Sequence, residues 1–186
     1  MKKIFLYSFY FVILVVSIIP IIFISIILFI TQGMPIIFWS ERVGKNKKLF
    51  KMPKFRSMKN DAPIIATHLL EQPEAKVTVI GRVLRKYSLD ELPQIISLFQ
   101  GNMSIVGPRP ALFNQHDLIS LREAKNIHAI LPGITGLAQI NGRDNISIED
   151  KVEYDYTYLR NKSFFYDLKI VFLTFLRIIK SKDISH

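Results

Sequence analysis

The sequence predicts a helix-rich α+β membrane protein, with an apolar N-terminal segment (residues 1–40) followed by one polar domain (residues 41–186). One observation behind this prediction is that no charged residue lies between Lys3 and Glu41. Another is that the remaining stretch, about 150 residues, has the length of one domain with its own core. Most apolar runs in that domain have helical spacing, whereas one segment near its start is typical of a strand.

The most apolar part of the N-terminal segment runs from Ile4 to Ile30 and carries one proline, Pro20, near its middle. A straight helix of that length would extend about 40 Å, and the hydrocarbon core of a bilayer is about 30 Å thick, so a tilted single span would fit. Proline has no N–H to donate, and its ring clashes with the carbonyl four residues earlier, here that of Val16. We therefore expect the helix to break at Pro20, and each limb alone is shorter than the bilayer core.

The charges that flank this segment bear on its topology. Lys2 and Lys3 lie on one side, and a longer group of Lys and Arg lies on the other, at positions 42, 45, 47, 48, 51 and 54. Because cytoplasmic flanks collect Lys and Arg, two basic flanks favour a re-entrant hairpin with both ends in the cytoplasm. Hydropathy alone fits an ordinary kinked span equally well. A cleaved signal peptide fits less well, because the apolar run is long and no A-x-A-like site follows it.

The domain is predicted to alternate short elements with turns. Leu49–Met58 mixes aromatic and basic residues, as a strand or an interfacial segment does, and 61–76 is polar with proline breakers. An amphipathic piece over Val77–Tyr87 precedes helices over Leu92–Phe99, Ile148–Leu159 and Phe164–Ile179, and turn-rich stretches lie at Gly101–Pro110 and Leu131–Arg143. The last helix is too short and too charged for a second span, so we expect a core or interfacial helix.

Composition narrows the classes of function. The chain has 25 Lys+Arg against 15 Asp+Glu, a net charge of +10 and a pI of about 9.8. This balance favours anionic partners such as acidic lipid headgroups, phosphates or nucleic acid. The membrane segment makes lipid and phosphate the stronger candidates. The absence of cysteine from the sequence excludes disulfides, thiolate metal sites and a cysteine nucleophile.

Two adjacent carboxylates, Asp90 and Glu91, form the most informative polar pair. A structural role is available, in which Ser88 is a helix N-cap and Glu91 completes a capping box. Pro93 weakens that alternative, because it would fall where an N–H is needed, whereas with Asp90 as N-cap it falls in the first turn. The second register would hold both carboxylates ionised at the positive end of the helix dipole. An ionised carboxylate can attack phosphorus or bind a hard cation such as Mg²⁺.

Several basic residues are candidates for phosphate binding, because the planar guanidinium of arginine matches phosphate oxygens. They are Lys54, Arg56, Arg85 and Arg109, whereas Arg82 and Lys86 are more typical of solvated surface charges. Pro108 and Pro110 fix the backbone on either side of Arg109, which is the rigid presentation that a binding residue needs. A glycine-rich stretch with Gln139 and Arg143 could approach a nucleotide closely, although glycine-rich turns alone are a weak signal.

Other acidic residues and the histidines are assigned no chemistry. The acidic residues predicted to lie on an exposed helical face are Asp150, Glu153 and Asp155. The histidines without metal-ligand spacing are His68, His116 and His128.

Four motifs follow the apolar segment in order. They are KFRSM at Lys54–Met58, SLDELPQ at Ser88–Gln94, GNMSIVGPRP at Gly101–Pro110 and PGITGLAQINGR at Pro132–Arg143. Together they resemble the bacterial sugar transferases, the monotopic phosphoglycosyl transferases that start glycan assembly on a polyprenyl phosphate. The resemblance covers nearly the whole chain. It implies a monotopic protein of the bacterial inner membrane, with a re-entrant helix broken at Pro20 and a small cytoplasmic catalytic domain with interfacial helices.

The resemblance also implies a reaction. A sugar 1-phosphate is transferred from a UDP-sugar to undecaprenyl phosphate, with release of UMP and dependence on Mg²⁺. By similarity Asp90 is the nucleophile that forms a covalent aspartyl phospho-sugar, Glu91 is the magnesium-associated carboxylate, and Asp90 is a second candidate metal ligand. Lys54 and Arg85 would contact phosphate, and Arg109 the nucleotide end of the donor.

Alternatives remain open at this level. Short family members suggest an N-acetylated amino sugar, with a hexose such as galactose or glucose as the alternative. A non-enzymatic, membrane-tethered basic module that binds acidic lipid or nucleic acid would explain the charge and the anchor, but not SLDELPQ or the proline-flanked Arg109. The expected partners are a UDP-sugar, undecaprenyl phosphate and membrane lipids, without nucleic acid, and a homodimer is left open.

Overall fold

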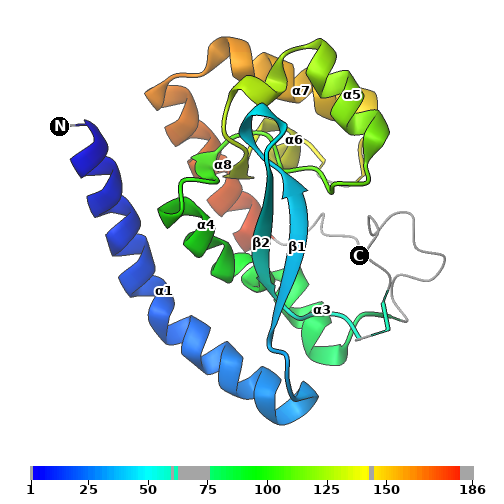
Figure 1. Ribbon diagram of the computed structural model, residues 1–186. Coiled ribbons are helices and arrows are strands. Elements are labelled where there is room, and N and C mark those ends of the chain that lie inside the picture. Colours follow the sequence, from blue (N-terminus) through cyan, green and yellow to red (C-terminus); the bar gives the residue numbers. More distant parts are fainter. Residues whose placement is uncertain (1, 60, 63–75, 143–144, 181–186) are drawn as a thin grey trace.

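The computed structural model describes residues 2–59, 61–62, 76–142 and 145–180, and Figure 1 shows its elements. A long helix leads into an antiparallel hairpin, and shorter helices then surround a small parallel strand pair. The helices are α1 (Lys2–Gln32), α3 (Val79–Lys86), α4 (Ile95–Phe99), α5 (His116–Ala124), α6 (Leu137–Ile140), α7 (Ile148–Asn161) and α8 (Phe164–Lys180). The strands are β1 (Ile37–Val43), β2 (Leu49–Phe55), β3 (Ser104–Val106) and β4 (Gly133–Thr135), and the 3₁₀ turns are η1 (Lys45–Lys47), η3 (Leu89–Gln94) and η4 (Ile127–Ala129). These elements confirm the predicted helix-rich α+β class.

Strand β2 forms within Leu49–Met58, where a strand was one of two predictions, whereas its partner β1 lies where no strand was predicted. The two strands form an antiparallel hairpin, with Ile37 opposite Phe55. Because alternate side chains point to opposite faces of a strand, Arg42 and Lys54 share one face with Met52. Met52 is buried and packs in one cluster with Ile95 and Leu98 of α4, the helix that directly follows η3. The hairpin face that carries these two cations therefore lies against the segment that carries the carboxylate pair.

The parallel pair of β3 and β4 lies in the two stretches that were predicted as turns. Strands of three residues give no periodic signal, so sequence pattern could not reveal them. Gly133 permits the close approach: a Cβ there would lie 2.1 Å from the Gly107 nitrogen and 2.5 Å from the Thr135 oxygen. The Gly107 N–H donates to the Thr135 carbonyl at 2.9 Å. This pairing fixes the start of the Pro108–Pro110 segment.

Helix α1 packs against the domain along one narrow stripe. Leu14, Ser17, Ile21, Ile24 and Leu28 recur every three or four residues and therefore lie on one face, which is buried or half-buried. Within the described residues, α1 is the one helix long and apolar enough to cross a membrane, over Leu14–Gln32. A core helix of a soluble protein would be covered all round, whereas Ile19 is 78% exposed. The exposed apolar surface is compatible with a membrane anchor.

Pro20 lies inside α1 without interrupting the helix. The helix is continuous from Lys2 to Gln32, and its axis changes direction part-way along its length (Figure 1). The predicted break is therefore a bend in this structure. At the C-terminal end, the Arg56 guanidinium donates to the carbonyls of Gln32 and Gly33 at 2.5 and 2.9 Å. Arg56, the residue directly after β2, thus connects the hairpin to the C-terminal end of α1 by hydrogen bonds.

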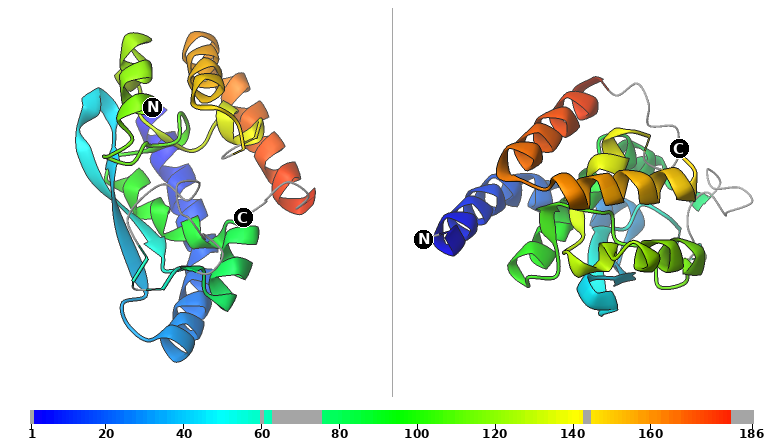
Figure 2. Two further views of the ribbon diagram at one scale, coloured as in Figure 1. Left: turned by 90° about the vertical axis from the view of Figure 1, so that its right-hand side faces the viewer. Right: turned by 90° about the horizontal axis from the view of Figure 1, so that it is seen from above.

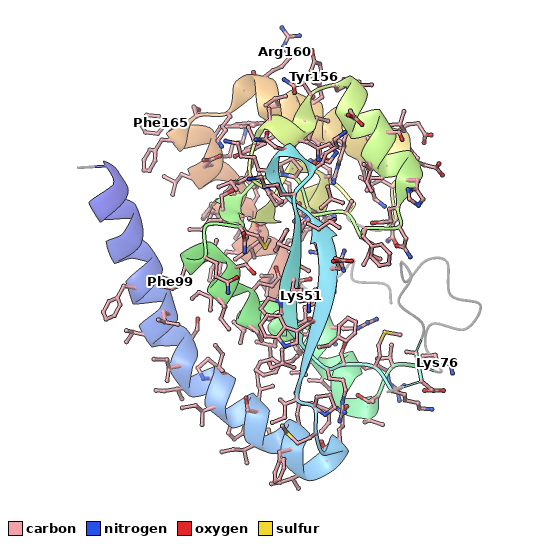
Figure 3. The ribbon with its side chains drawn as sticks, viewed as in Figure 1. Lys51, Lys76, Phe99, Tyr156, Arg160 and Phe165 are labelled. Carbon is pink, nitrogen blue, oxygen red and sulfur yellow. The ribbon has the colours of Figure 1, made fainter. Side chains whose placement is uncertain are left out.

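Helix α8 has one covered and one open face, which agrees with the predicted core or interfacial helix. Ile170 is buried, and the Thr174 hydroxyl shares a hydrogen bond of 2.7 Å with that of Thr135. On the opposite side Phe165 is 80% exposed and points away from the domain (Figure 3). The other exposed apolar residues of α8 are Phe164, Leu168, Phe172 and Phe175.

We expect Gly133→Ala to destabilise the domain, because the new methyl would meet backbone atoms of Gly107 and Thr135 that cannot rotate away. The expected cost is about 1–3 kcal/mol or more, and it is measured as a lowered thermal unfolding midpoint in detergent. Gly101→Asn is the control, since Asn tolerates the positive φ of 72° and nothing lies within 4 Å of that position. Equal midpoints for Gly133→Ala and wild type would contradict the tight β3–β4 contact.

Candidate active site

The carboxylate pair lies in the 3₁₀ turn η3, and both Asp90 and Glu91 are buried. Neither predicted capping arrangement is observed. Ser88 occupies the N-cap position with a left-handed backbone and makes no side-chain cap, and Pro93 lies inside the turn. Proline has no N–H to donate the backbone hydrogen bond that an α-helix needs there. The α-helical geometry of α4 begins only after it, at Ile95. The environment of the two carboxylates is therefore set by neighbouring side chains rather than by an α-helix dipole.

Glu91 is held by two cations from distant parts of the chain. Arg109 donates to both carboxylate oxygens, with Nη2 to Oε1 at 2.6 Å and Nη1 to Oε2 at 3.3 Å. Lys54 Nζ approaches Oε1 at 3.1 Å. A two-pronged guanidinium–carboxylate contact fixes both direction and distance. Arg109 stays 24% exposed, so an incoming anion can reach it.

Lys54 is largely buried, and its protonation reflects that burial. The pKa of Lys54 is lowered to about 8, mainly by burial; Glu91 and Asp90 oppose the shift, whereas Arg109 and Arg42 add to it. These five side chains interact electrostatically within one cluster. Three cations against two carboxylates leave a local excess of positive charge. Such a cluster suits an anionic ligand.

The Pro108–Pro110 segment is anchored through its carbonyl groups. The Pro108 carbonyl accepts from the Gly133 N–H at 2.9 Å. The Arg109 carbonyl accepts from Arg122 Nη1 at 2.8 Å, and the Pro110 carbonyl from Arg42 Nη1 at 3.2 Å. The donors come from β4, α5 and β1. Three successive carbonyls are thus held by three separate elements, and the expected rigid presentation of Arg109 has a structural basis.

Arg42 was expected only as a charge that flanks the membrane segment, with no role in the site. In the structure its guanidinium donates to Ser40 Oγ at 2.6 Å and to Pro110. Because it also lowers the pKa of Lys54, it belongs to the same cluster. Arg42 and Lys54 lie on the same face of the hairpin, but this can be recognised only once the pairing register of β1 and β2 is known.

The prediction that Asp155 lies on an exposed face is wrong. Asp155 is 1% exposed, and its Oδ2 accepts from Arg122 Nε at 3.0 Å and Nη2 at 2.5 Å. Burial raises the pKa of Asp155, and Arg122 opposes that shift. Figure 2 shows α5 and α7, which carry the pair, side by side. The signal in the sequence was the spacing of three residues from Val152 and from Tyr158, which places Asp155 on their buried face.

For three other predicted site residues, the described hydrogen bonds go to partners outside this cluster. The described bonds of Arg56 go to the end of α1. Arg85 donates through Nε to Ser57 Oγ at 3.0 Å, just after β2. Gln139 Nε2 donates to the Ile134 carbonyl at 3.0 Å. Arg143 lies outside the described residues. Asp90, Glu91, Lys54 and the Pro108–Pro110 segment are the predicted residues that the structure brings together.

Within the described part of the chain, the remaining predicted acidic residues and histidines form no group that could hold a metal ion. Asp150 and Glu153 are exposed, as predicted. His116 is exposed, and half-buried His128 hydrogen-bonds the Ile119 carbonyl at 3.3 Å. His68 lies outside the described residues.

A sequence model of the bacterial sugar transferase family matches residues 1–181. The chain belongs to this family. The four ordered motifs therefore identified the family correctly, and the prediction of an enzyme of the sugar transferase class is confirmed.

Relatives of this sugar transferase fall into two lengths. The sugar transferase EpsL of Bacillus subtilis (strain 168) is 42% identical over 153 residues, which cover 82% of this chain and 74% of EpsL. The UDP-glucose:undecaprenyl-phosphate glucose-1-phosphate transferase of Escherichia coli (strain K12) is 45% identical over 150 residues, which cover 75% of this chain and 32% of that protein. The undecaprenyl-phosphate galactose phosphotransferase of Salmonella typhimurium is 34% identical over 170 residues, which cover 82% of this chain and 35% of that protein. The chain thus spans about a third of each of the last two relatives.

The donor set of the transferase fits magnesium in the way that phosphate enzymes use it. Among the described residues, no three His, Cys, Asp or Glu side chains gather into a metal cage. Mg²⁺ is commonly bound through one or two carboxylates together with substrate phosphates. Glu91 and Asp90 supply two adjacent buried carboxylates, so the pair matches that pattern.

We expect Glu91→Gln to lower the pKa of Lys54 below about 8. The substitution removes the largest influence that favours protonated Lys54, while the desolvation that favours the neutral amine stays. NMR titration of ¹³C-labelled lysine, assigned with Lys54→Arg, measures the shift. Glu153→Gln is the control, because that carboxylate pairs with the partly exposed Lys125. A Lys54 pKa that stays the same or rises in Glu91→Gln would overturn this account of the cluster.

Proposed function

We propose that this transferase moves a sugar 1-phosphate from a UDP-sugar to undecaprenyl phosphate and releases UMP, as the first membrane step of glycan assembly. The observation that carries the proposal is the buried cluster in which Glu91, next to Asp90, is clamped by Arg109 and Lys54. Phosphoryl transfer needs a nucleophile in line with the leaving group and cations around the diphosphate. The names of the E. coli and Salmonella relatives support both substrates.

Asp90 is the proposed nucleophile. Its carboxylate attacks the phosphorus that carries the sugar, a bond forms between Asp90 and that phosphorus, and the bond to the bridging oxygen breaks. UMP leaves with the bridging oxygen and its electron pair. A phosphate oxygen of undecaprenyl phosphate then attacks the same phosphorus and expels the Asp90 carboxylate, which restores the enzyme.

The cations have separate proposed tasks in this scheme. Arg109, partly exposed, binds the nucleotide end of the diphosphate, and Lys54 neutralises charge on the phosphate being transferred. Arg85, which bonds Ser57 after β2, is a further phosphate contact. Glu91 would hold Mg²⁺, which, when bound, neutralises charge on the diphosphate.

The donor sugar is proposed to be a hexose. The sequence alone suggested an N-acetylated amino sugar, with glucose or galactose as the alternative. The E. coli and Salmonella relatives are named as a glucose-1-phosphate transferase and a galactose phosphotransferase, and this favours the alternative.

A monotopic arrangement at the cytoplasmic face is proposed for the membrane. The domain packs along α1 from Leu14 to Leu28, on both sides of Pro20. A polar domain cannot lie in hydrocarbon, so α1 cannot cross the whole bilayer with that stripe covered. A shallow re-entrant insertion resolves this conflict, and the exposed phenylalanines of α8 would then rest in the interface.

The non-enzymatic alternative, a tethered basic module for acidic lipid or nucleic acid, is disfavoured. It gives no reason for two buried carboxylates in a cationic cluster, because burying charge is costly without a function or a partner. Family membership points the same way.

The test of the reaction is UMP release over a panel of UDP-sugars in detergent, with and without undecaprenyl phosphate. We expect turnover with UDP-glucose or UDP-galactose to exceed that with N-acetylated donors. Without acceptor, a carboxylate nucleophile should release about one UMP per enzyme and leave a sugar phosphate on Asp90. Asp90→Asn should abolish this burst, because an amide is a poor nucleophile, and mass spectrometry should locate the adduct in wild type.

The control for that experiment is Asp117→Asn, an exposed aspartate at the start of α5, which should keep the burst. Substantial turnover by Asp90→Asn, or an adduct at another residue, would refute the nucleophile while leaving the overall reaction standing. The absence of UMP release with every donor would refute the reaction itself.

A separate prediction concerns magnesium. Glu91→Gln should raise the Mg²⁺ concentration needed for half-maximal UMP release and lower the maximal rate, because one of the two oxygen donors is lost. Glu153→Gln, which changes an exposed carboxylate, should leave both unchanged. A magnesium response like that of wild type in Glu91→Gln would remove the metal assignment.

The topology prediction uses reporters at the N-terminus and after residue 45. Both should be cytoplasmic, and Pro20→Leu should shift molecules toward a full span with the N-terminus outside, because the bend is removed. Ile22→Leu keeps the proline and should leave the topology unchanged. A native N-terminus in the periplasm would exclude the re-entrant arrangement.

A further inference from the structure

Arg122 connects the ion pair of α5 and α7 to the backbone of Arg109. Its side chain is 4% exposed, and its three bonding nitrogens divide their tasks. Nε and Nη2 donate to Asp155 Oδ2 at 3.0 and 2.5 Å, and Nη1 donates to the Arg109 carbonyl at 2.8 Å. Because a guanidinium is planar and rigid, fixing two of its nitrogens also fixes the third.

The Pro108–Pro110 segment, whose Arg109 carbonyl accepts this hydrogen bond, has few other hydrogen-bonding groups. Pro108 and Pro110 lack N–H groups, so the carbonyls are the main hydrogen-bonding groups of the segment. Gly133 holds the carbonyl before Arg109 and Arg42 the carbonyl after it. The carbonyl of Arg109 itself depends on Arg122. Its side chain starts from that backbone and reaches Glu91 at 2.6 Å.

A purely structural role explains this pair poorly. A buried ion pair contributes little net stability, and well-packed apolar residues often replace it without loss. Apolar residues cannot bond a carboxylate and a carbonyl at once, whereas arginine can. In the described contacts, neither Arg122 nor Asp155 bonds Lys54 or Glu91, so both act through the backbone of Arg109.

We propose that Arg122, oriented by Asp155, is a positioning residue that sets the place of Arg109 for the UDP-sugar. This deepens the proposed function and rests on it. Loss of the Arg122 bond lets the Arg109 backbone shift, and a shift of about 1 Å in a binding group is enough to reduce activity up to a hundredfold.

The test replaces both members of the pair at once, as Arg122→Met with Asp155→Leu, so that no buried charge is left unpaired. The thermal unfolding midpoint should stay at or above that of wild type. The KM for UDP-sugar should rise about tenfold or more, whereas the KM for undecaprenyl phosphate should change little. The matched control is Lys125→Met with Glu153→Leu, a partly exposed ion pair that also joins the end of α5 to α7, and it should leave both KM values unchanged.

A single variant separates the ion pair from the bond to Arg109. Arg122→Lys keeps a cation opposite Asp155, but one ammonium lacks the rigid fork that spans both partners. A folded Arg122→Lys enzyme with a raised KM for the donor supports positioning. Full rescue by lysine would mean that charge alone matters, and this would overturn the proposal.

Hydrogen exchange provides a readout that needs no turnover. The amides of Gly107, Arg109, Ala111 and Leu112 should exchange faster in the Arg122/Asp155 double variant than in wild type or in the Lys125/Glu153 control. If exchange and the donor KM are both unchanged in a folded double variant, positioning is refuted. If wild type releases no UMP with any donor, the proposed function fails, and exchange alone decides whether Arg122 positions the segment.

Discussion

The site depends on one constraint, which is that charges removed from water must find partners inside the protein. Glu91 is buried between Lys54 and Arg109, and these three residues come from η3, β2 and the segment after β3. Each charge is tolerated because the others are close. The hairpin, the 3₁₀ turn and the proline-flanked segment must therefore be placed together, and a shift in one of them leaves a buried charge without its partner.

The same constraint explains why the fold around the site is rigid and locally irregular. Two three-residue parallel strands approach closely because Gly133 has no side chain at their contact. The carbonyls that follow β3 then bond to β4, α5 and β1. Backbone that belongs to no regular element must satisfy its polar groups through specific partners. Two of those three partners are the arginines Arg122 and Arg42, so charge that suits an anionic substrate also holds the loop.

The two apolar surfaces place this polar cluster near a lipid phase. Helix α1 covers the domain with one stripe and exposes the remainder of its described apolar surface, and α8 exposes a row of phenylalanines beyond its covered face. A substrate with a phosphate headgroup and a polyprenyl chain has the same division into polar and apolar parts. An enzyme that acts on such a substrate needs an apolar membrane anchor next to a cationic site.

The sequence by itself determined the family, the apolar segment that contains Pro20 and the helix-rich class, and it predicted Asp90, Glu91, Lys54 and Arg109 as site residues. These are local signals, carried by motifs, hydropathy and spacing within a few residues. Tertiary structure alone decided that Asp155 is buried against Arg122, that Arg42 faces the site and that Arg56 fastens α1. Such contacts join residues that are far apart in the chain, and one sequence does not give the distance in space between two elements. The packing of α5 against α7 and the register of the hairpin set those distances. Burial then requires each charge to pair with a cation or carboxylate that the fold brings within reach.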